Sequence, residues 1–362
     1  MNQDQLNKLR VKCERSLYHF AKIVFGFDNF SDSLHLPTCD WLQAVPPRRK
    51  CLLMPRDHYK TSIAQALVAH IIIQPPEHNI YWPSVDGSNL RILYAAETDE
   101  TAKKRIGLIQ RHFESNDLLR ALWPEKVWQN PKDARDWSIT KFTLPRSKDF
   151  PESTVEISGV GTAVTGRHYN VKIEDDLIGQ RARDEITTTM PATIEWYKAS
   201  EALMDPPMVY LEFIFGTRWA HYDLYSWMQS EDTSVEFKIR KVLENGQPLF
   251  PELMSLEYIE SLRQRKGELF YLNYMNEVTG GAVNAFDLSR LRFYNLEKDG
   301  SIAFDVLPPE TFDMPEPMPP EPEAAPIKPK RFWQTTPQER VERWNRKHED
   351  WRRERSMRHV LD

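Results

Sequence analysis

The chain of 362 residues has few cysteines, no long apolar run and no excess of positive charge. Its three cysteines, Cys13, Cys39 and Cys51, are odd in number and lack CxxC spacing, which argues against a disulfide scaffold and suits reduced thiols in a cytoplasm. No apolar stretch reaches the roughly 18 residues that a membrane-spanning helix needs, and the polar residues 1–5 do not resemble a signal peptide. A formal net charge of −5 argues against a wholly basic nucleic-acid coat. We therefore expect a soluble intracellular protein, long enough for one large or two ordinary domains.

Glycine is also scarce, and none of the 13 glycines lies in the most informative segment, residues 51–61. This segment reads as a buried strand and a turn that ends in Lys60-Thr61, where a proline-free apolar run to Ile73 predicts a helix. The first turn of such a helix can bind an anion. The match to the phosphate-binding pattern GxxxxGK[ST] is incomplete, because Met54 and Tyr59 stand where glycines are usual. The alternative is an amphipathic core helix that begins with Lys-Thr by chance.

A second motif, residues 166–176, ends in the adjacent carboxylates Asp175 and Asp176. A nucleotide hydrolase needs one acid at such a strand end to hold Mg²⁺ and a second to orient the attacking water. Lys172 and Glu174 make this run less apolar than a central strand is expected to be. Two acids after a weak strand can also be a solvated strand end or a helix cap.

A third motif is the β-rich run at residues 208–216, which ends in Gly216-Thr-Arg-Trp. Together with runs at 51–54, 91–96, 154–158 and 170–174 it predicts strands that alternate with helices, the pattern of a mostly parallel α/β sheet. Ligands bind at the carboxyl ends of such strands, so the three motifs are expected at one edge of the sheet. Further helices are predicted over residues 6–25, 255–265 and 267–276.

These motifs, in this order, resemble the ATPase part of the large terminase subunit of tailed bacteriophages, over about residues 15–290. Residues 55–61 resemble its variant Walker A motif, residues 166–176 its Walker B segment, and residues 216–219 its coupling motif. Residues 91–98 and 250–276 are similar to its second strand-helix unit and to the segment that closes its core. The resemblance implies an ASCE-type P-loop NTPase fold and a motor that hydrolyses ATP with Mg²⁺ to drive double-stranded DNA into a procapsid.

The resemblance also implies roles for individual residues. Lys60 would reach the β- and γ-phosphates, Thr61 and Asp175 would hold Mg²⁺, and Asp176 would orient water. Thr217 would sense the γ-phosphate. The remaining predicted contacts to nucleotide lie in the loop and its surroundings: Arg56, Asp57, His58, Tyr59, Ser62 and, for adenine, His35. Arg167 is predicted as an arginine finger acting on a neighbouring subunit. Each arginine can instead form an ordinary salt bridge, and a lone histidine is usually structural.

The predicted organisation has five parts. A helical lead-in spans residues 1–48, the ATPase core 49–245, a closing helical segment 246–300, a proline-rich acidic linker 301–336 and a charged C-terminal helix 337–362. Nine of the 22 residues from Pro308 to Pro329 are proline, which predicts an extended linker without a core. Trp344 and Trp351 lie seven residues apart on one face of the last helix, which is either solvated or docks on a partner.

Partners are implied by the resemblance as well. They are double-stranded DNA, a small terminase subunit, the portal protein and further copies of the chain in a ring, with no membrane, in the host cell cytoplasm. Residues 48–50 and 103–105 are candidate DNA contacts, or ordinary solvated surface. Too few residues follow position 276 for the RNase H-like nuclease that large terminases usually carry, so cutting would fall to a separate nuclease chain. Two alternatives stay open: a helicase-like or repurposed P-loop ATPase without the coupling element, and a decayed ATPase that acts as an assembly scaffold.

Overall fold

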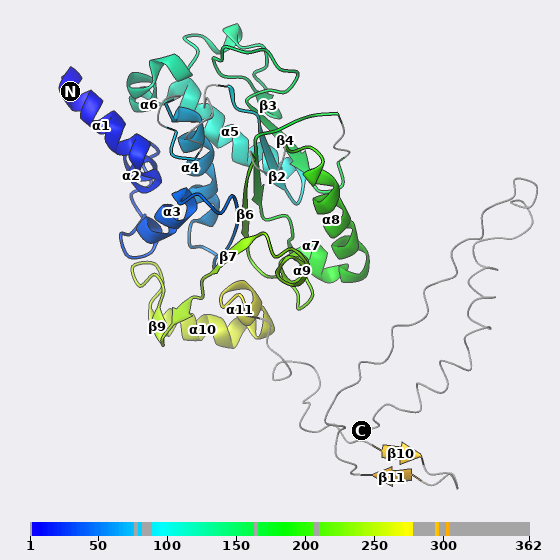
Figure 1. The fold of residues 1–362 in the computed structure, drawn as a ribbon. Coiled ribbons are helices and arrows are strands. Elements are labelled where there is room, and N and C mark those ends of the chain that lie inside the picture. Colours follow the sequence, from blue (N-terminus) through cyan, green and yellow to red (C-terminus); the bar gives the residue numbers. More distant parts are fainter. Residues whose placement is uncertain are drawn as a thin grey trace, which may run out of the picture. The chain divides into compact units, whose positions relative to one another are not determined.

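The computed structural model describes residues 2–75, 79–81, 89–162, 166–205 and 210–277, together with the short strands β10 (Tyr294–Leu296) and β11 (Ile302–Phe304) (Figure 1). The chain divides into two compact units, Met1–Thr279 and Gly280–Asp362. In the second unit, β10 and β11 pair with each other antiparallel. Apart from β11, the predicted linker 301–336 and helix 337–362 lie outside the described residues.

The first unit is built on a seven-stranded sheet with the order β3-β4-β2-β5-β6-β1-β7. Every neighbouring pair is parallel except β3 and β4, so the predicted mostly parallel α/β sheet is confirmed. The strands are β1 Arg49–Leu53, β2 Ile92–Ala96, β3 Lys141–Phe142, β4 Val155–Gly159, β5 Val171–Asp175, β6 Leu211–Gly216 and β7 Glu236–Ile239. The sequence did not predict the edge strands β3 and β7, nor the small hairpin of β8 (Leu243–Glu244) and β9 (Gln247–Pro248).

Helices cover both faces of the sheet (Figure 1). Alternate strand residues enter two apolar clusters, one under α4 and α5 and one under α8 and α9, because successive side chains of a strand point to opposite faces. The α-helices are α1 Gln3–Arg15, α2 Leu17–Ile23, α3 His35–Gln43, α4 Lys60–Ile73, α5 Asp99–Ser115, α6 Asp117–Leu122, α7 Gln180–Asp184, α8 Ile186–Glu201, α9 Leu224–Glu231, α10 Leu256–Lys266 and α11 Glu268–Asn273. Among the described residues no helix is both long and apolar enough to cross a membrane.

The helix predicted over residues 6–25 differs from what the structure contains, whereas the helix predicted from Lys60 is confirmed. The helix expected over residues 6–25 is broken at Ser16, whose extended backbone ends α1 and whose hydroxyl accepts the backbone N–H of His19 to begin α2. Helix α4 begins at Lys60 as predicted, but it is not amphipathic, because every residue from Ile63 to Ile73 is buried. It is a core helix that packs against the sheet, α2 and α5.

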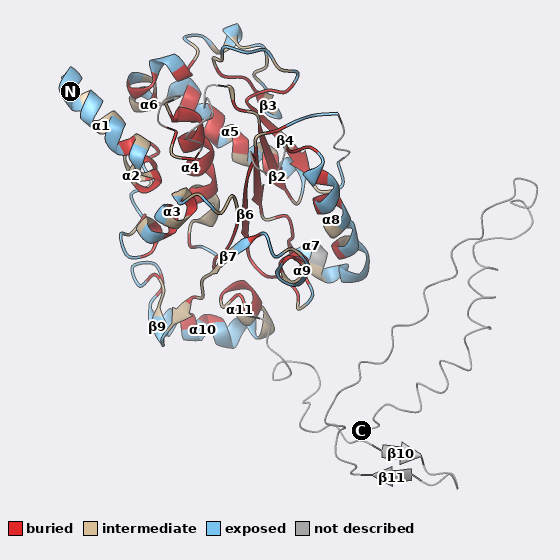
Figure 2. Ribbon diagram, viewed as in Figure 1, coloured by how far each residue is buried: buried red, intermediate tan, exposed pale blue. Residues whose placement is uncertain are grey.

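Strand β5 is a central strand in spite of its charged residues. Figure 2 shows the strands in the middle of the sheet as buried, and Lys172 and Glu174 are both fully enclosed. The Lys172 ammonium lies 2.6 Å from a carboxylate oxygen of Glu212 on β6 and 3.2 Å from one of Glu174, and donates to the Ser200 hydroxyl on α8. Arg49 contacts Glu212 from the other side at 2.5 Å. Paired charges therefore replace apolar side chains on this face of the strand.

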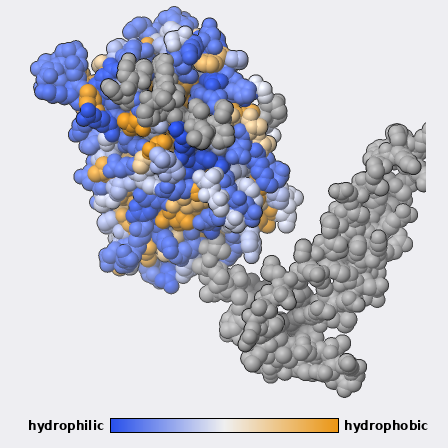
Figure 3. Space-filling view, viewed as in Figure 1, coloured by the Kyte–Doolittle hydropathy of each residue, from blue (hydrophilic) through white to orange (hydrophobic). Residues whose placement is uncertain are grey.

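The surface of the first unit is mostly polar in the view of Figure 3, where hydrophilic side chains surround small apolar spots. Eight large apolar side chains are exposed among the described residues. They are Val11, Leu108, Ile139, Ile186, Tyr222, Leu253, Leu256 and Tyr258.

Candidate active site

The loop of residues 54–59 connects β1 to α4 at the carboxyl edge of the sheet. Asp57 and Tyr59 have φ angles of 69° and 60°, in the left-handed region where glycine is usual. The loop therefore makes the sharp turn into the helix without glycine, at about 1–2 kcal/mol for each of these residues. Arg56 and Asp57 are exposed, and Ser62 is half-buried in the first turn of α4.

Lys60, the first residue of α4, lies against Asp176, the residue that follows β5. Its ammonium is 2.8 Å from each carboxylate oxygen of Asp176. The two residues are 116 positions apart in the sequence, and β6 lies between the strands that lead to them. Asp176 has a φ of 54°, and its backbone N–H donates to Phe215 O at the end of β6. The lysine and the second acid of the predicted site therefore meet.

Thr61, the residue after Lys60, meets Asp175, the residue before Asp176. The Thr61 hydroxyl donates to Asp175 Oδ1 at 3.2 Å, and the Tyr94 hydroxyl from β2 donates to Asp175 Oδ2 at 3.0 Å. Arg105 on α5 approaches the same oxygen at 3.4 Å. Asp175 is fully buried, and burial, followed by the negative charge of Asp176, raises its pKa to about 6.

These two residues fit a magnesium ion better than a metal held by protein alone. Among the described residues no three His, Cys, Asp or Glu side chains gather as a metal site. Mg²⁺ usually takes only one or two protein oxygens and completes its shell with water and phosphate. The adjacent hydroxyl and carboxylate oxygens of Thr61 and Asp175 are hard donors of that kind.

Thr217, which follows β6, is joined to the loop. Its hydroxyl donates to Met54 O at 3.2 Å, and it is almost fully buried. The Arg56 guanidinium lies over the Trp219 ring, 4.8 Å from its centroid. The closing helix α11 contacts both segments: Asn273 accepts the Arg56 N–H at 3.1 Å through its carbonyl and donates its amide to Arg218 O at 2.6 Å. Movement at the end of β6 would therefore reach the loop directly.

The predicted adenine contact, His35, is fully buried behind the loop. Its ring stacks on Phe30 with centroids 4.4 Å apart, lies 5.9 Å from the Tyr59 ring, and accepts the Ser31 N–H at Nδ1. Burial lowers its pKa to about 4. His58 is buried too and is held by the Arg56 carbonyl at 2.8 Å. Both histidines are neutral core residues in this structure, whereas Tyr59 is only half-buried.

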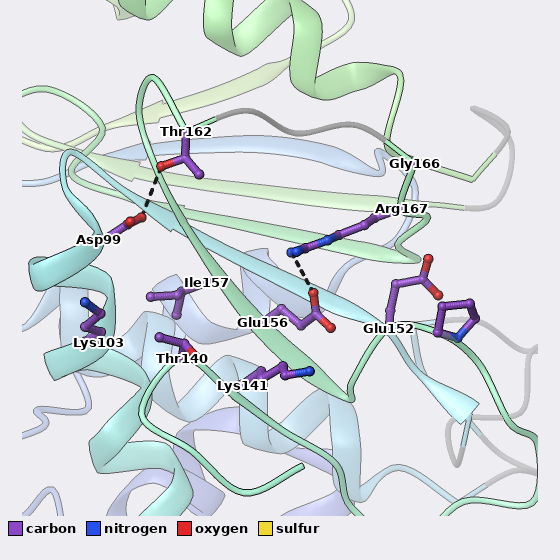
Figure 4. A pocket seen from close by; sticks show the side chains of 11 residues that line it. Asp99, Lys103, Thr140, Lys141, Glu152, Glu156, Ile157, Thr162, Gly166 and Arg167 are labelled. Atoms are coloured by element: carbon purple, nitrogen blue, oxygen red, sulfur yellow. Dashed lines mark hydrogen bonds and ion pairs between the residues drawn. The ribbon is translucent and has the colours of Figure 1, made fainter. Parts of the chain in front are cut away.

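Arg167 lies apart from these groups. It precedes β5 and thus belongs to the amino end of the strand, whereas Asp175 ends it. Its guanidinium pairs with Glu156 of β4 at 3.0 Å, beside a cavity of about 500 Å³ that Glu152 and Lys141 also line (Figure 4). The structure does not bring Arg167 to the Lys60 side of its own chain, and its predicted action on a neighbouring subunit stays a prediction.

Two charged residues at the site were not predicted there. Glu97 directly follows β2, and its N–H donates to Asp176 O at 3.0 Å. An acid that ends a strand was a signal in the sequence that could have revealed it. Arg105 was predicted as a DNA contact, but it points to Asp175.

Two residues of the basic run at 48–50, Arg49 and Lys50, are also corrected as DNA contacts. Arg49 is ion-paired with Glu212, and Lys50 is buried, where its ammonium donates to carbonyls at the end of α3. Positive charges held in this way are not free to bind phosphates.

A scan against protein-family models finds no family that matches this chain, and a search of curated proteins finds none that is similar.

Proposed function

We propose that this chain is an ATPase with a P-loop NTPase fold. The observation that carries the proposal is a pair of side-chain hydrogen bonds between distant parts of the chain. Lys60 donates to Asp176, 116 positions away, and Thr61 donates to Asp175, 114 positions away. A P-loop enzyme requires a lysine for the phosphates, a hydroxyl and an acid for Mg²⁺ and an acid for water, all at one helix N-terminus. The sequence motifs predict these four residues for those roles.

The strand order supports the ASCE subdivision of that fold, in which an additional strand separates the loop strand from the acid strand. Strand β6 has that position between β1 and β5. Thr217 directly follows β6, and the end of this strand lies between the loop and the acids, where Thr217 can respond to the γ-phosphate.

The residues of the site act by binding and orienting. Backbone N–H groups of the first turn of α4 and the Lys60 ammonium would bind the phosphates. Thr61 and Asp175 would hold Mg²⁺, which would supply positive charge to the phosphate oxygens. The ion pair with Asp176 keeps the lysine extended towards the strand ends. Tyr59 is half-buried at the start of α4, and Arg56 is an exposed residue of the loop that can contact phosphate.

Among ATPases of this fold, the ordered motifs favour a terminase large subunit that packages viral DNA from the host cytoplasm. The link from Thr217 to Met54, and from α11 to both segments, is a physical route by which hydrolysis can move the closing segment. The expected partners are double-stranded DNA, the portal protein, a small terminase subunit and further copies of this chain in a ring, with a separate nuclease chain for cutting.

The test is DNA-stimulated ATP hydrolysis by the wild type and by Lys60→Ala. Loss of the lysine should reduce the rate by at least a hundredfold, because it removes the charge that binds the β- and γ-phosphates. Lys8→Ala is the matched control, since this lysine lies outside the candidate DNA contacts, is 77% exposed and pairs with Asp4 in its own helix. Equal rates in the wild type and Lys60→Ala would refute the ATPase proposal.

The same protein samples separate the alternatives. Unwinding of a duplex would favour the helicase-like ATPase. A melting temperature that does not rise with MgATP would favour the scaffold, because a ligand that binds only the folded state must stabilise that state.

A further inference from the structure

Glu97 is placed at the candidate active site by the sheet itself. Strand β2 pairs in parallel with β5, so the residue after β2 lies beside the residue after β5. The hydrogen bond from the Glu97 N–H to Asp176 O fixes this neighbourhood at 3.0 Å. Glu97 is half-buried, and its Oε1 atom is enclosed without a hydrogen-bond partner in the part of the chain that the structure describes.

The other oxygen of the Glu97 carboxylate lies against the backbone of Gly179, in the segment between β5 and α7. A Cβ atom at position 179 would overlap Glu97 Oε2. The φ of Gly179 is −141°, which any residue can adopt, so glycine is needed here for close approach and not for backbone conformation. A side chain at position 179 would therefore displace the Glu97 carboxylate, one of whose oxygens has no hydrogen-bond partner among the described residues.

Asp176 Oδ1 also has no hydrogen-bond partner among the described residues, so what separates the two acids is the Lys60 ammonium, which lies 2.8 Å from each Asp176 oxygen and donates to Oδ2. This counterion makes Asp176 less suited to accept a proton from water. A carboxylate that must accept a proton works best when no cation neutralises it. Glu97 carries no salt bridge among the described residues, and a glutamate side chain is one methylene longer than an aspartate side chain.

We propose that Glu97 is the carboxylate that positions the attacking water and accepts its proton, while Asp176 holds Lys60; this inference rests on the proposed ATPase function. In the step, the water oxygen forms a bond to the γ-phosphorus and the bond from that phosphorus to the β,γ-bridging oxygen breaks. The bridging oxygen leaves on ADP with the electron pair, and the proton of the water passes to the Glu97 carboxylate.

The experiment compares steady-state ATP hydrolysis and the MgATP-induced rise in melting temperature in four variants. Glu97→Gln keeps the size of the side chain and removes the base, so kcat should fall by about 10² to 10⁴ while KM and the thermal shift stay near the wild-type values. Gly179→Ala should push the carboxylate aside, and kcat should fall at least tenfold without loss of the thermal shift. Glu100→Gln is the control, because its carboxylate is 68% exposed on α5 and should leave both readouts unchanged.

Lys60→Ala, measured in parallel, separates the two proposals. If the wild type hydrolyses ATP and Lys60→Ala does not, the ATPase proposal stands, and Glu97→Gln then decides this one. A Glu97→Gln protein with a kcat within threefold of wild type would overturn the role of Glu97, as would one that loses the thermal shift along with activity. If the wild type neither hydrolyses ATP nor is stabilised by it, both proposals fall.

Discussion

Replacing Lys60 by methionine removes the cation that contacts both oxygens of Asp176 while keeping a side chain of similar length. Asp176 then faces Asp175 and Glu97 without this counterion. The prediction is that the variant loses stability, and that Asp176→Asn in the same chain restores part of it. A double-mutant cycle with Lys60→Met, Asp176→Asn and the combined variant measures the coupling between the two side chains.

The size of the coupling follows from the distance and the exposure of the pair. Two unit charges 2.8 Å apart attract by about 6 kcal/mol at an effective dielectric constant of about 20. Lys60 is 11% and Asp176 28% exposed, so much of this attraction is offset by lost hydration. Charged hydrogen bonds of this kind contribute about 1.5–3 kcal/mol net, and we expect a coupling of about 2 kcal/mol.

The assay is urea denaturation of the four proteins without nucleotide, followed by far-UV circular dichroism. Lys104 and Glu100 provide the matched control pair: they lie 3.5 Å apart on α5, but their side chains are 74% and 68% exposed. Exposed pairs four residues apart on a helix contribute only about 0.2–0.5 kcal/mol. The active-site pair should therefore couple several times more strongly than the control pair.

Additive effects at Lys60 and Asp176, within about 0.5 kcal/mol, would refute this reasoning. Additive effects would mean that the Lys60 and Asp176 side chains do not contact each other in solution. The ATPase proposal would then lose its strongest support.

Two further predictions concern buried charge. Lys172→Met should lower the free energy of unfolding by about 3–5 kcal/mol in urea denaturation, because Glu174 and Glu212 lose the cation that they share. A loss below about 1 kcal/mol would contradict this prediction. The His70 ring lies between the Tyr81 hydroxyl and Cys13 O. Burial lowers the pKa of His70 from 6.5 to about 4. The contribution of the neutral His70 ring to stability is therefore present above pH 6.5 and is lost as the pH falls towards 4. His70→Gln lacks this titration, so its deficit relative to wild type should shrink by about 2 kcal/mol between pH 7 and pH 4.5, and a deficit that does not change with pH would exclude the mechanism.

Local pattern was sufficient for the parts of the fold that depend on nearby residues. The strands that carry the motifs, and the start of α4 at Lys60, follow from the alternation of apolar runs with turns. For most elements the predicted and observed bounds agree within one or two residues. The break at Ser16 was missed because helical periodicity continues across it, although a serine is also a good N-cap. Strand β7 was missed because its residues are half-exposed at the sheet edge and carry no strong pattern.

The charged residues show where local pattern fails. Lys172 and Glu174 weakened the prediction of a central strand, yet they lie in one because Glu212 and Arg49 on two other strands neutralise them. Arg105 looked like a surface charge on a helix, yet it reaches Asp175. No window of sequence contains these partners.

By itself the sequence determined which residues stand at the ends of strands, because hydrophobic runs, turns and helix starts are written in neighbouring residues. Only the tertiary structure decided which strand ends are neighbours: β6 between β1 and β5, and β2 on the far side of β5. That order depends on packing between segments more than a hundred residues apart, and it alone brings Glu97 beside Asp176 and Asp176 against Lys60.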